Sequence, residues 1–344
     1  MLTRIKHAGQ AACSGALVII CCSVTACTSN QSDTPPPTIA PAQAAVSPPA
    51  ARPPAGTVRP LAGHGTAALF DAATTSLVAL APGETGHGIV TVMPARGQGR
   101  TVALSAAASA MAGDGDGHAY AATRGGYFRI DIAQGRASRV PVDGHDRTEF
   151  TAIARRADGK LVLGSADGAV YTLSSDTTVG AELKIFARVD ALATQGDTTV
   201  VLDRGQTSVT TVDPSGTNAE HSLRAGEGAT TLAADTAGRV LVADTRGDGL
   251  LVFTVDPLIL RQRAPVRGAP YGLAGSSRLA WVSQTKTNTV VGYDLATGIP
   301  VEKVRYPTVQ QPNSLAFDEA SGTLYVVSGT GAGVQVIENA EAAR

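Results

Sequence analysis

The feature that most constrains this chain is a pattern that returns seven times after residue 60. Each repeat begins with an aliphatic residue that has a small neighbour, and in five of the seven repeats alanine follows directly. Successive starts are 35, 49, 39, 40, 41 and 42 residues apart. Such self-similarity indicates a fold built from one repeated unit of a few elements. The starts are Leu69, Leu104, Ile153, Leu192, Leu232, Leu273 and Leu315.

Two further apolar runs follow each start at short intervals. In the third repeat these are residues 161–163 and 170–173. Such runs are alternating, rich in β-branched residues and bounded by Gly, Asp and Ser, which is typical of strands. No sustained helical period occurs after residue 60. Three or four strands every ~40 residues predict an all-β, seven-bladed β-propeller.

The last repeat lacks an obvious fourth strand, because a polar tail follows soon after Ile337. We expect residues 57–62 to supply that strand and to close the ring. Pro60 counts against this pairing, since proline fits only an edge strand. Closure would leave no long exposed sheet edge, which keeps an all-β chain of this size soluble.

The first 27 residues are arranged like a secretory signal. Arg4 and Lys6 precede an apolar run over residues 11–24, which is too short to span ~30 Å of hydrocarbon comfortably. Residues 24–27, Val-Thr-Ala-Cys, resemble the bacterial lipobox. The resemblance implies that residues 1–26 are a cleaved signal peptide and that Cys27 carries a diacylglyceryl anchor. The alternatives are an uncleaved transmembrane helix or an ordinary signal cut elsewhere.

Residues 27–56 lie between the lipobox cysteine and the repeats, and they are dominated by small residues and proline. Nine of the nineteen prolines fall within residues 28–60. Such a stretch has little apolar surface to bury, so it is expected to be disordered. Proline biases it towards an extended form, and we expect a tether that holds the propeller, residues 57–344, up to ~100 Å from the membrane.

The cysteines and the charges narrow the choice of partners. All four cysteines lie within residues 1–27, so the predicted propeller has neither disulfides nor thiolate metal sites. The formal net charge is −1, and no basic cluster offers the electrostatic footprint that nucleic acid requires.

The later repeats resemble a known propeller family. Residues 288–298 (NTVVGYDLATG), 311–318 (QPNSLAFD) and 322–327 (GTLYVV) are similar to the YVTN-type repeat. The resemblance is good over residues 229–337, whereas earlier repeats keep only the spacing and the strand cores. The whole chain also resembles actinobacterial Lpp-type lipoproteins, which have an Ala/Pro linker ahead of a propeller. These likenesses imply a cell-envelope location and say little about chemistry.

No motif of catalysis, metal binding or cofactor binding stands out. The chain lacks a G-x-G-x-x-G loop, a P-loop and a G-x-S-x-G elbow, and its histidines are widely spaced. A serine triad assembled across blades stays open. Residues 114–118 (DGDGH) resemble the start of a calcium loop, but position twelve is Gly125 rather than glutamate. A turn is the favoured reading of that segment.

One distributed set of polar residues remains. In a propeller, the loops that enter each innermost strand share a face with the loops that join the second and third strands. Convergent charges on such a rim are what an orienting ligand site needs, although solvated loops would have the same composition. The candidate ligand-facing residues are Glu149, Asp190, Arg204, Glu227, Arg246, Tyr271 and Asn313, and Arg124, Asp203, Asp244 and Lys286 belong to the same loops.

The sequence therefore predicts an extracytoplasmic lipoprotein whose propeller is a binding or scaffolding module without cofactor or metal. Its partners would be the membrane, through the anchor, and an envelope protein, a glycan or a small molecule. The alternative is a lactonase-like hydrolase with its site at the propeller mouth, because related propellers include lactonases. Fold alone does not decide between these functions.

Overall fold

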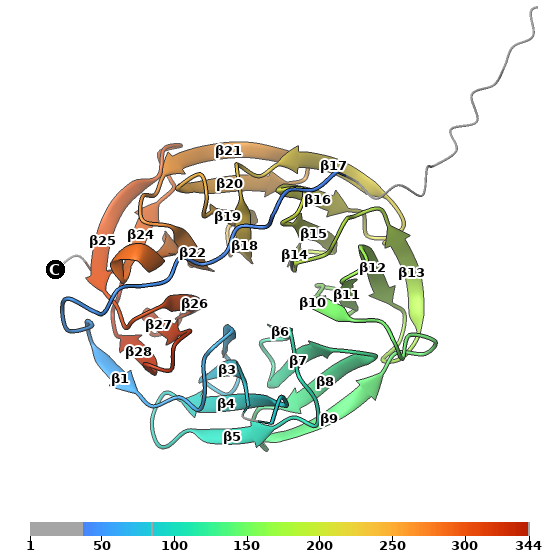
Figure 1. Ribbon diagram of the computed structural model, residues 1–344, viewed down its shortest axis with the longest axis horizontal. Helices are drawn as coiled ribbons and strands as arrows, with labels where there is room; N and C mark the ends of the chain where they lie inside the picture. Colours follow the sequence, from blue (N-terminus) through green and yellow to red (C-terminus); the bar gives the residue numbers. More distant parts are fainter. Residues whose placement is uncertain (1–36, 84, 343–344) are drawn as a thin grey trace, which may run out of the picture. The chain divides into compact units, whose positions relative to one another are not determined.

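The computed structural model describes residues 37–83 and 85–342, which consist mostly of β-strands (Figure 1). Within these residues the strands form seven four-stranded antiparallel sheets, arranged like blades around a common axis. Each sheet begins with its innermost strand and proceeds outward in chain order, except that the last sheet takes its outermost strand from the N-terminal side. The predicted seven-bladed β-propeller is confirmed.

The blades follow one another along the chain. Blade 1 comprises β2 (Ala67–Asp71), β3 (Ser76–Pro82), β4 (Gly88–Pro94) and β5 (Arg100–Ala103), and blade 2 comprises β6 (Ala110–Gly113), β7 (His118–Thr123), β8 (Gly126–Asp131) and β9 (Arg136–Pro141). Blade 3 comprises β10 (Phe150–Arg155), β11 (Leu161–Ser165), β12 (Ala169–Leu173) and β13 (Val179–Lys184), and blade 4 comprises β14 (Ala191–Gln195), β15 (Thr198–Asp203), β16 (Ser208–Val212) and β17 (Ala219–Arg224).

The last three blades have the same plan. Blade 5 comprises β18 (Ala229–Ala234), β19 (Arg239–Asp244), β20 (Gly249–Val255) and β21 (Leu258–Pro265). Blade 6 comprises β22 (Pro270–Gly275), β23 (Leu279–Gln284), the short 3-10 helix η1 (Thr285–Thr287), β24 (Thr289–Asp294) and β25 (Val301–Pro307). Blade 7 comprises β26 (Pro312–Asp318), β27 (Thr323–Ser328), β28 (Val334–Ile337) and β1 (Thr57–Arg59).

The ring is closed by pairing between the two ends of the propeller, as the sequence predicts. Strand β1 runs antiparallel to β28, with Thr57 opposite Val336 and Arg59 opposite Val334. Pro60 directly follows the strand, so its missing amide removes no ladder hydrogen bond. Arg59 also donates to the carbonyl oxygen of Pro94 at 2.7 Å, which joins blade 7 to blade 1.

The structure corrects the predicted start of the second repeat. Leu104 lies in a loop just after β5, the outermost strand of blade 1, and the innermost strand of blade 2 is β6, which carries Met111. With Met111 as the start, the first two spacings become 42 and 42 residues, and the irregular 49-residue repeat disappears. The repeat starts were identified by an aliphatic residue, and Met111, which occupies the equivalent position in blade 2, did not fit that criterion.

The core lies between neighbouring blades rather than within a single sheet. Strands β11, β12 and β23 are buried along their whole length, because each blade is covered on both faces by its neighbours. Trp281 is fully buried and stacks on Tyr306 of its own blade and Phe317 of blade 7. At Gly164 an added Cβ would lie 2.1 Å from a methyl carbon of Val189, so this packing requires glycine.

Residues 38–55, which we call the strap, run extended across one face of the propeller before β1 begins (Figure 1, blue). This differs from the expectation of a disordered tether over residues 27–56. The Ile39 amide donates to the Gly205 carbonyl oxygen at 2.8 Å, and the Ala55 amide donates to Pro307 at 3.0 Å. Composition indicated disorder because the strap buries few side chains, but its backbone finds partners on the blades. Residues 27–36 of the expected tether, like the signal peptide and Cys27, lie outside the described residues.

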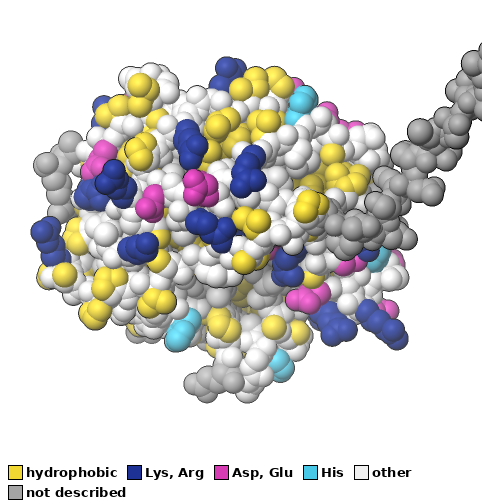
Figure 2. Space-filling model, turned by 45° about the horizontal axis from the view of Figure 1, so that its top comes forward, with side chains coloured by type: hydrophobic (Ala, Val, Ile, Leu, Met, Phe, Trp, Pro, Cys, Tyr) yellow, Lys and Arg dark blue, Asp and Glu magenta, His cyan; other side chains and the backbone are white. Residues whose placement is uncertain are grey.

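The outer surface of the propeller is chemically mixed. Figure 2 shows Lys and Arg side chains interspersed with acidic ones, between scattered hydrophobic groups. The exposed large hydrophobics include Ile259 and Leu260 on β21, and Ile299 and Val301 at the edge of blade 6. Among the residues described, no helix combines the length and apolarity needed to cross a bilayer.

Candidate functional site at the propeller mouth

A central cavity of about 300 Å³ lies on the axis, and all seven blades contribute to it. Its walls are the innermost strands and the loops that enter them, where small residues such as Ala67, Ala110 and Ala152 leave room around the axis. Five lining residues carry hydroxyl groups that donate to backbone carbonyl oxygens of the protein, namely Thr66, Ser109, Thr230, Thr231 and Ser314. The cavity is therefore a polar funnel at the lower end of the size range of ligand sites.

Four of the predicted rim residues line this cavity together. They are Asp190 and Arg204 of blade 4, Tyr271 of blade 6 and Asn313 of blade 7. They lie far apart in the sequence, and ring closure brings them to one mouth. The cavity thus combines a carboxylate, a guanidinium, a phenol and an amide above a ring of small and hydroxylated residues.

The other three predicted rim residues do not line the cavity. Glu149 lies where the chain enters blade 3 and forms an isolated backbone bridge with Arg124. Glu227 uses its amide to donate to Asp244 at 3.0 Å, and its carbonyl oxygen accepts from Arg246 at 3.2 Å. Arg246 also donates to the carbonyl oxygen of Ala40 in the strap at 2.6 Å. These residues surround the cavity without entering it.

Asp190 is the carboxylate that lines the cavity, and its side chain is largely buried. Its side chain is 10% exposed and accepts from the Arg188 guanidinium at 3.1 Å and from the Arg204 amide at 2.8 Å. Burial raises the pKa of Asp190 above its ordinary value, against the opposing effect of these donors. A carboxyl held in this way can exist in either protonation state nearer to neutral pH than an exposed aspartate.

Arg204 connects the cavity with the strap. Its backbone amide binds Asp190, and one terminal nitrogen donates to the carbonyl oxygen of Ala42. Its Nε is buried without a hydrogen-bond partner among the described residues. Because this nitrogen is buried, a ligand in the cavity would reach it only after the side chain moves.

Two further predicted rim residues, Asp203 and Asp244, are buried and already used. Asp244 is inaccessible to solvent and accepts from the amides of Glu227, Gly228 and Gly247 at 2.8–3.0 Å. Asp203 is 1% exposed and binds the loop that enters blade 4 in the same way. Both carboxylates hold loops in place through these hydrogen bonds, so Asp203 and Asp244 do not belong to the ligand-facing residues.

Gln311 was not among the predicted rim residues, yet it makes the most hydrogen bonds between the mouth-side face and the strap. Its side chain accepts from the Ser47 amide at 2.9 Å and donates to the Ala45 carbonyl oxygen at 2.9 Å. The backbone amide of Gln311 donates to Ser47 Oγ at 3.1 Å. A glutamine in a loop carries no sequence signal for such a role, because its partner lies 264 residues away.

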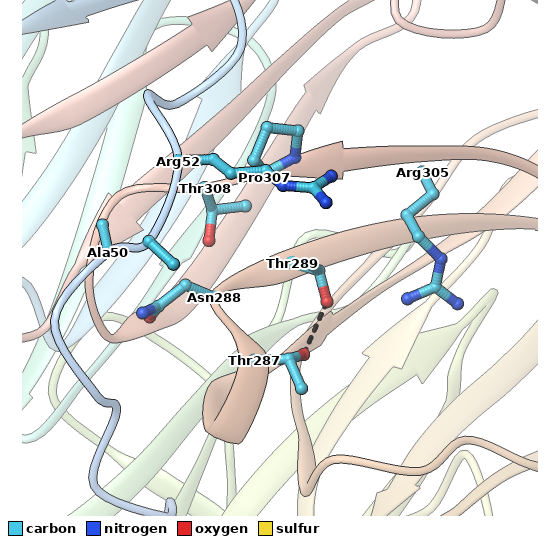
Figure 3. A pocket seen from close by; sticks show the side chains of 9 residues that line it. Ala50, Arg52, Thr287, Asn288, Thr289, Arg305, Pro307 and Thr308 are labelled. Atoms are coloured by element: carbon cyan, nitrogen blue, oxygen red, sulfur yellow. Dashed lines mark hydrogen bonds between the residues drawn. The ribbon is translucent and has the colours of Figure 1, made fainter.

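A second, smaller cavity of about 270 Å³ lies between the strap and blade 6 (Figure 3). The strap contributes Arg52, and the blade contributes Arg305 and a group of threonines. Thr287 and Thr289 hydrogen-bond each other through their hydroxyl groups at 2.8 Å. Arg305 makes two hydrogen bonds to Glu302, at 2.7 and 2.8 Å, and these lower the pKa of Glu302. The charge of Arg305 is therefore already matched by an acid.

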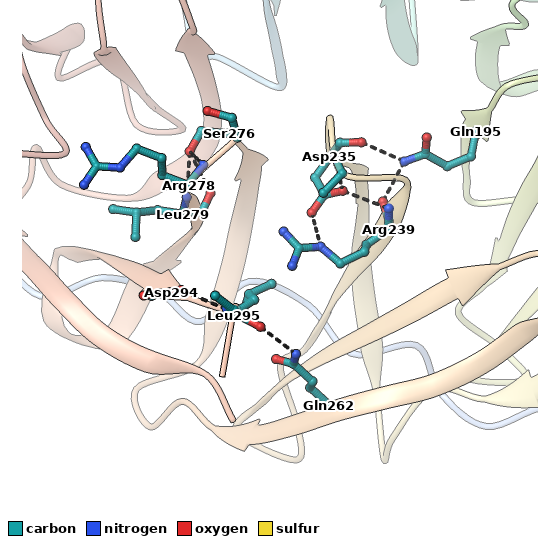
Figure 4. A network of polar contacts seen from close by, with 12 residues as sticks. Gln195, Asp235, Arg239, Gln262, Ser276, Arg278, Leu279, Asp294 and Leu295 are labelled. Carbon is teal, nitrogen blue, oxygen red and sulfur yellow. Dashed lines mark hydrogen bonds and ion pairs between the residues drawn. The ribbon is translucent and has the colours of Figure 1, made fainter. Parts of the chain in front are cut away.

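The opposite face of the propeller carries the turns between the first and second strands of each blade. Residues 114–118 form such a turn, in which Asp114 accepts from the amides of Asp116 and His118 at 2.9 Å. The favoured reading of this segment as a turn is therefore correct. In Figure 4, Asp235 binds Arg239 at 2.6 Å, and Gln195 reaches the backbone of the same turn.

Within the part of the chain that the structure describes, no three of His, Cys, Asp and Glu come close enough together to hold a metal ion.

Comparison with known proteins supports the architecture alone. No protein-family model and no curated protein matches the sequence. Among solved structures, the chain is similar to Kuenenia stuttgartiensis hydrazine synthase (TM-score 0.64, 15% identity, 83% of this chain and 98% of that one). It is also similar to U3-55K (TM-score 0.66, 13% identity, 82% and 97%) and to a streptogramin B lyase (TM-score 0.62, 10% identity, 83% and 96%). At these identities the likeness shows a shared propeller fold and no shared activity.

Proposed function

We propose that this chain is an extracytoplasmic lipoprotein, anchored to the cell membrane by a diacylglyceryl group on Cys27, whose propeller is a binding module of the cell envelope. The observation that carries the binding role is the meeting of Asp190, Arg204, Tyr271 and Asn313 in one polar cavity. The signal-like segment and the lipobox-like residues 24–27 support the anchor. We further propose that blades 5 to 7 are related to YVTN-type repeats, and the whole chain to Lpp-type lipoproteins.

The cavity favours a small polar group as its occupant. Its hydroxyl oxygens can accept from a neutral, hydroxyl-rich ligand such as part of a glycan, and Tyr271 and Asn313 add polar side chains to the lining. The group could belong to a free small molecule or project from an envelope glycan or protein. Because one arginine and one aspartate balance each other, the cavity does not select strongly for charge.

The anchor is tested by substitution in the native host. We expect Cys27→Ala to move the protein from the membrane fraction to the soluble exported fraction, because its only lipid-bearing thiol is lost. Cys22→Ala is the matched control, since Cys22 lies within the apolar run, and it should leave the protein in the membrane. Full membrane retention of Cys27→Ala would contradict the proposed anchor.

The binding role is tested with the purified domain and a panel of envelope glycan fragments and small metabolites. We expect a ligand that raises the melting temperature of the wild type to lose this effect in Asn313→Ala and Asp190→Asn. Glu149→Gln is the matched control, because Glu149 does not line the cavity. A ligand whose binding is unaffected by both cavity substitutions would place the site elsewhere.

A lactonase-like hydrolase at the mouth is the second candidate. The observation in its favour is Asp190, whose raised pKa suits a general base or acid better than an ordinary aspartate. Turnover of a lactone by the wild type and its loss in Asp190→Asn, with tight stoichiometric metal in the purified protein, would favour the enzyme. Binding of a ligand without turnover of any lactone would favour the binding module.

A further inference from the structure

The strap contacts the propeller mainly through its own backbone. Carbonyl oxygens of Ala40, Ala42, Ala45, Ser47 and Pro48 accept hydrogen bonds from side chains of blades 4 to 7. The donors are Arg246, Arg204, Gln311, Gln310 and Asn288. An extended segment rich in proline and alanine has no internal hydrogen bonds, so it presents its carbonyl oxygens unpaired. The rim therefore recognises an extended backbone.

Only two strap side chains between residues 38 and 50 are buried. Ala42 is 7% exposed and Ser47 is 4% exposed, whereas the neighbouring Val46 is 89% exposed. Ser47 Oγ donates to the Thr285 carbonyl oxygen at 2.6 Å. The strap is thus held by two small side chains and a row of hydrogen bonds, and it leaves two large apolar side chains, Ile39 and Val46, exposed. Such shallow docking is separable from the fold, whose core lies between the blades.

The two ends of the strap are held differently. At its C-terminal end, β1 is built into the sheet of blade 7, and Gln335 donates to the Ala55 carbonyl oxygen at 2.7 Å. At its N-terminal end, the last described contact is that of Ile39 with Gly205. Release of residues 38–50 would therefore leave the ring closed, because β1 stays paired with β28.

We propose that residues 38–50 are a detachable ligand of the propeller's own rim, and that their docking and release shorten and lengthen the spacer between Cys27 and the propeller. The docking part stands on the contacts above, and the spacer part rests on the proposed anchor. Thr38 follows Cys27 by eleven positions and Ala51, the first residue after the detachable segment, follows it by twenty-four. At ~3.1 Å per extended residue, the greatest reach is about 34 Å with the segment docked and about 74 Å with it released.

Release also changes what the mouth offers. Arg204 and Arg246 both donate to strap carbonyl oxygens in the docked form. When the strap leaves, both guanidinium groups lose these acceptors beside the central cavity. The rim could then accept another extended segment of the same kind in place of the strap, because the contacts recognise backbone and two small side chains.

The docking is tested with the mature chain, residues 27–344, carrying Ser47→Tyr, and with Val46→Tyr as the matched control. The tyrosine at position 47 cannot enter a site shaped for serine, whereas position 46 points to solvent. We expect the Ile39 amide, which lies eight residues away, to exchange about tenfold faster or more in Ser47→Tyr and at the wild-type rate in Val46→Tyr. Unchanged melting temperatures verify that both variants keep the propeller intact. Equal exchange at Ile39 in both variants would overturn the proposal of a detachable strap.

A labelled peptide with the sequence of residues 37–50 gives a second measurement on the same proteins. Fluorescence anisotropy should show binding to Ser47→Tyr, whose rim is free, and at least about tenfold weaker binding to the wild type, whose rim is occupied. Adding Gln311→Ala to Ser47→Tyr should abolish binding, because the side chain that holds Ser47 and Ala45 is removed. No binding to Ser47→Tyr, or equal binding to wild type, would contradict a rim that acts as a receptor.

The spacer part is tested without relying on cellular lipidation, because Cys27 is the only cysteine of the mature chain. The thiol is coupled to a maleimide lipid in a supported bilayer, and the distance from bilayer to propeller is measured by neutron reflectometry. We expect a gap within the docked reach for the wild type and Val46→Tyr, and a wider one for Ser47→Tyr. The same gap in all three would refute the spacer, whereas failure of the Cys27→Ala test in cells would refute only the native anchor.

Discussion

The two faces of the propeller satisfy their polar groups in different ways. On the opposite face, Asp114, Asp235 and Asp318 each accept hydrogen bonds from the amides of their own turn. On the mouth-side face, Asp203 and Asp244 bind loops that lead from one blade to the next, and Gln311 binds the strap across more than 260 residues. The turns of the opposite face are therefore held mainly by local contacts, to which Gln195 of the preceding blade adds hydrogen bonds at the Asp235 turn, while the mouth-side face depends more on segments brought together by the ring. Because the donors of the mouth-side face hold the removable strap, that face is the one suited to bind another partner in its place.

The largest difference between the faces is expected at Asp244. Asp244→Ala removes the acceptor of three buried amides from two loops, which should lower the free energy of unfolding by about 3 kcal/mol. The measurement is denaturant-induced unfolding of the purified domain. A loss no greater than that of a turn aspartate on the opposite face would remove the contrast drawn here.

Asp235→Ala probes the opposite face at a buried carboxylate. The Asp235 side chain is 1% exposed and pairs with Arg239, so we expect a loss of about 2 kcal/mol in the free energy of unfolding. Hydrogen exchange should quicken within residues 235–239 and remain unchanged at the mouth. Faster exchange at the rim would show that this turn is not self-contained.

Asp114→Ala should have a smaller effect, about 1 kcal/mol, because it removes one turn cap. Burial alone would raise the pKa of Asp114, but the amides of His118 and Asp116 outweigh it and lower the pKa below its ordinary value of 3.8. A lowered folded pKa contributes stability that is present above pH 3.8 and is lost as the pH falls through the folded value. The difference between wild type and variant should therefore shrink in acid, as measured by unfolding at pH 7 and pH 2. If the difference in stability between wild type and variant did not depend on pH, the charged form of Asp114 would be excluded as the source of the stabilisation.

Arg204→Ala should change the free energy of unfolding least, by less than about 1 kcal/mol. Its effect should instead be local, at the contact between the mouth-side face and the strap. The substitution removes the donor to Ala42 but leaves the backbone contact with Asp190. Exchange of the Ile39 amide should quicken while the core strands keep their protection. If the exchange rate of the Ile39 amide is unchanged, Arg204 lines the cavity but does not hold the strap.

Much of the fold could be predicted because its signals are local and repeated. Short apolar runs such as residues 161–163, bounded by turn residues, define strands without knowledge of their partners. The pairing of residues 57–59 with the last blade also followed from counting, since one strand was missing there. The second repeat was misplaced at Leu104 because Met111, an apolar residue of another type, occupies the expected position.

The candidate site could be predicted only in part. Asp190 directly precedes the innermost strand β14 and Asn313 lies at the start of β26, so the repeat places them at the mouth. Asp203 and Asp244 occupy equally suitable positions in the sequence, yet they are buried beneath neighbouring loops. Whether a loop carboxylate faces solvent or caps a neighbouring loop depends on blade-to-blade packing, which one repeat does not encode.

The sequence by itself determined the number of blades, their strands and the loops that meet at the mouth, because short-range patterns decide strands and turns. The tertiary structure alone decided that residues 38–55 lie on the rim and that Arg204, Gln311 and Ser47 hold them there. The physical reason is that a proline-rich segment carries no apolar pattern of its own. Its place is set by unpaired carbonyl oxygens that meet donors from distant parts of the chain.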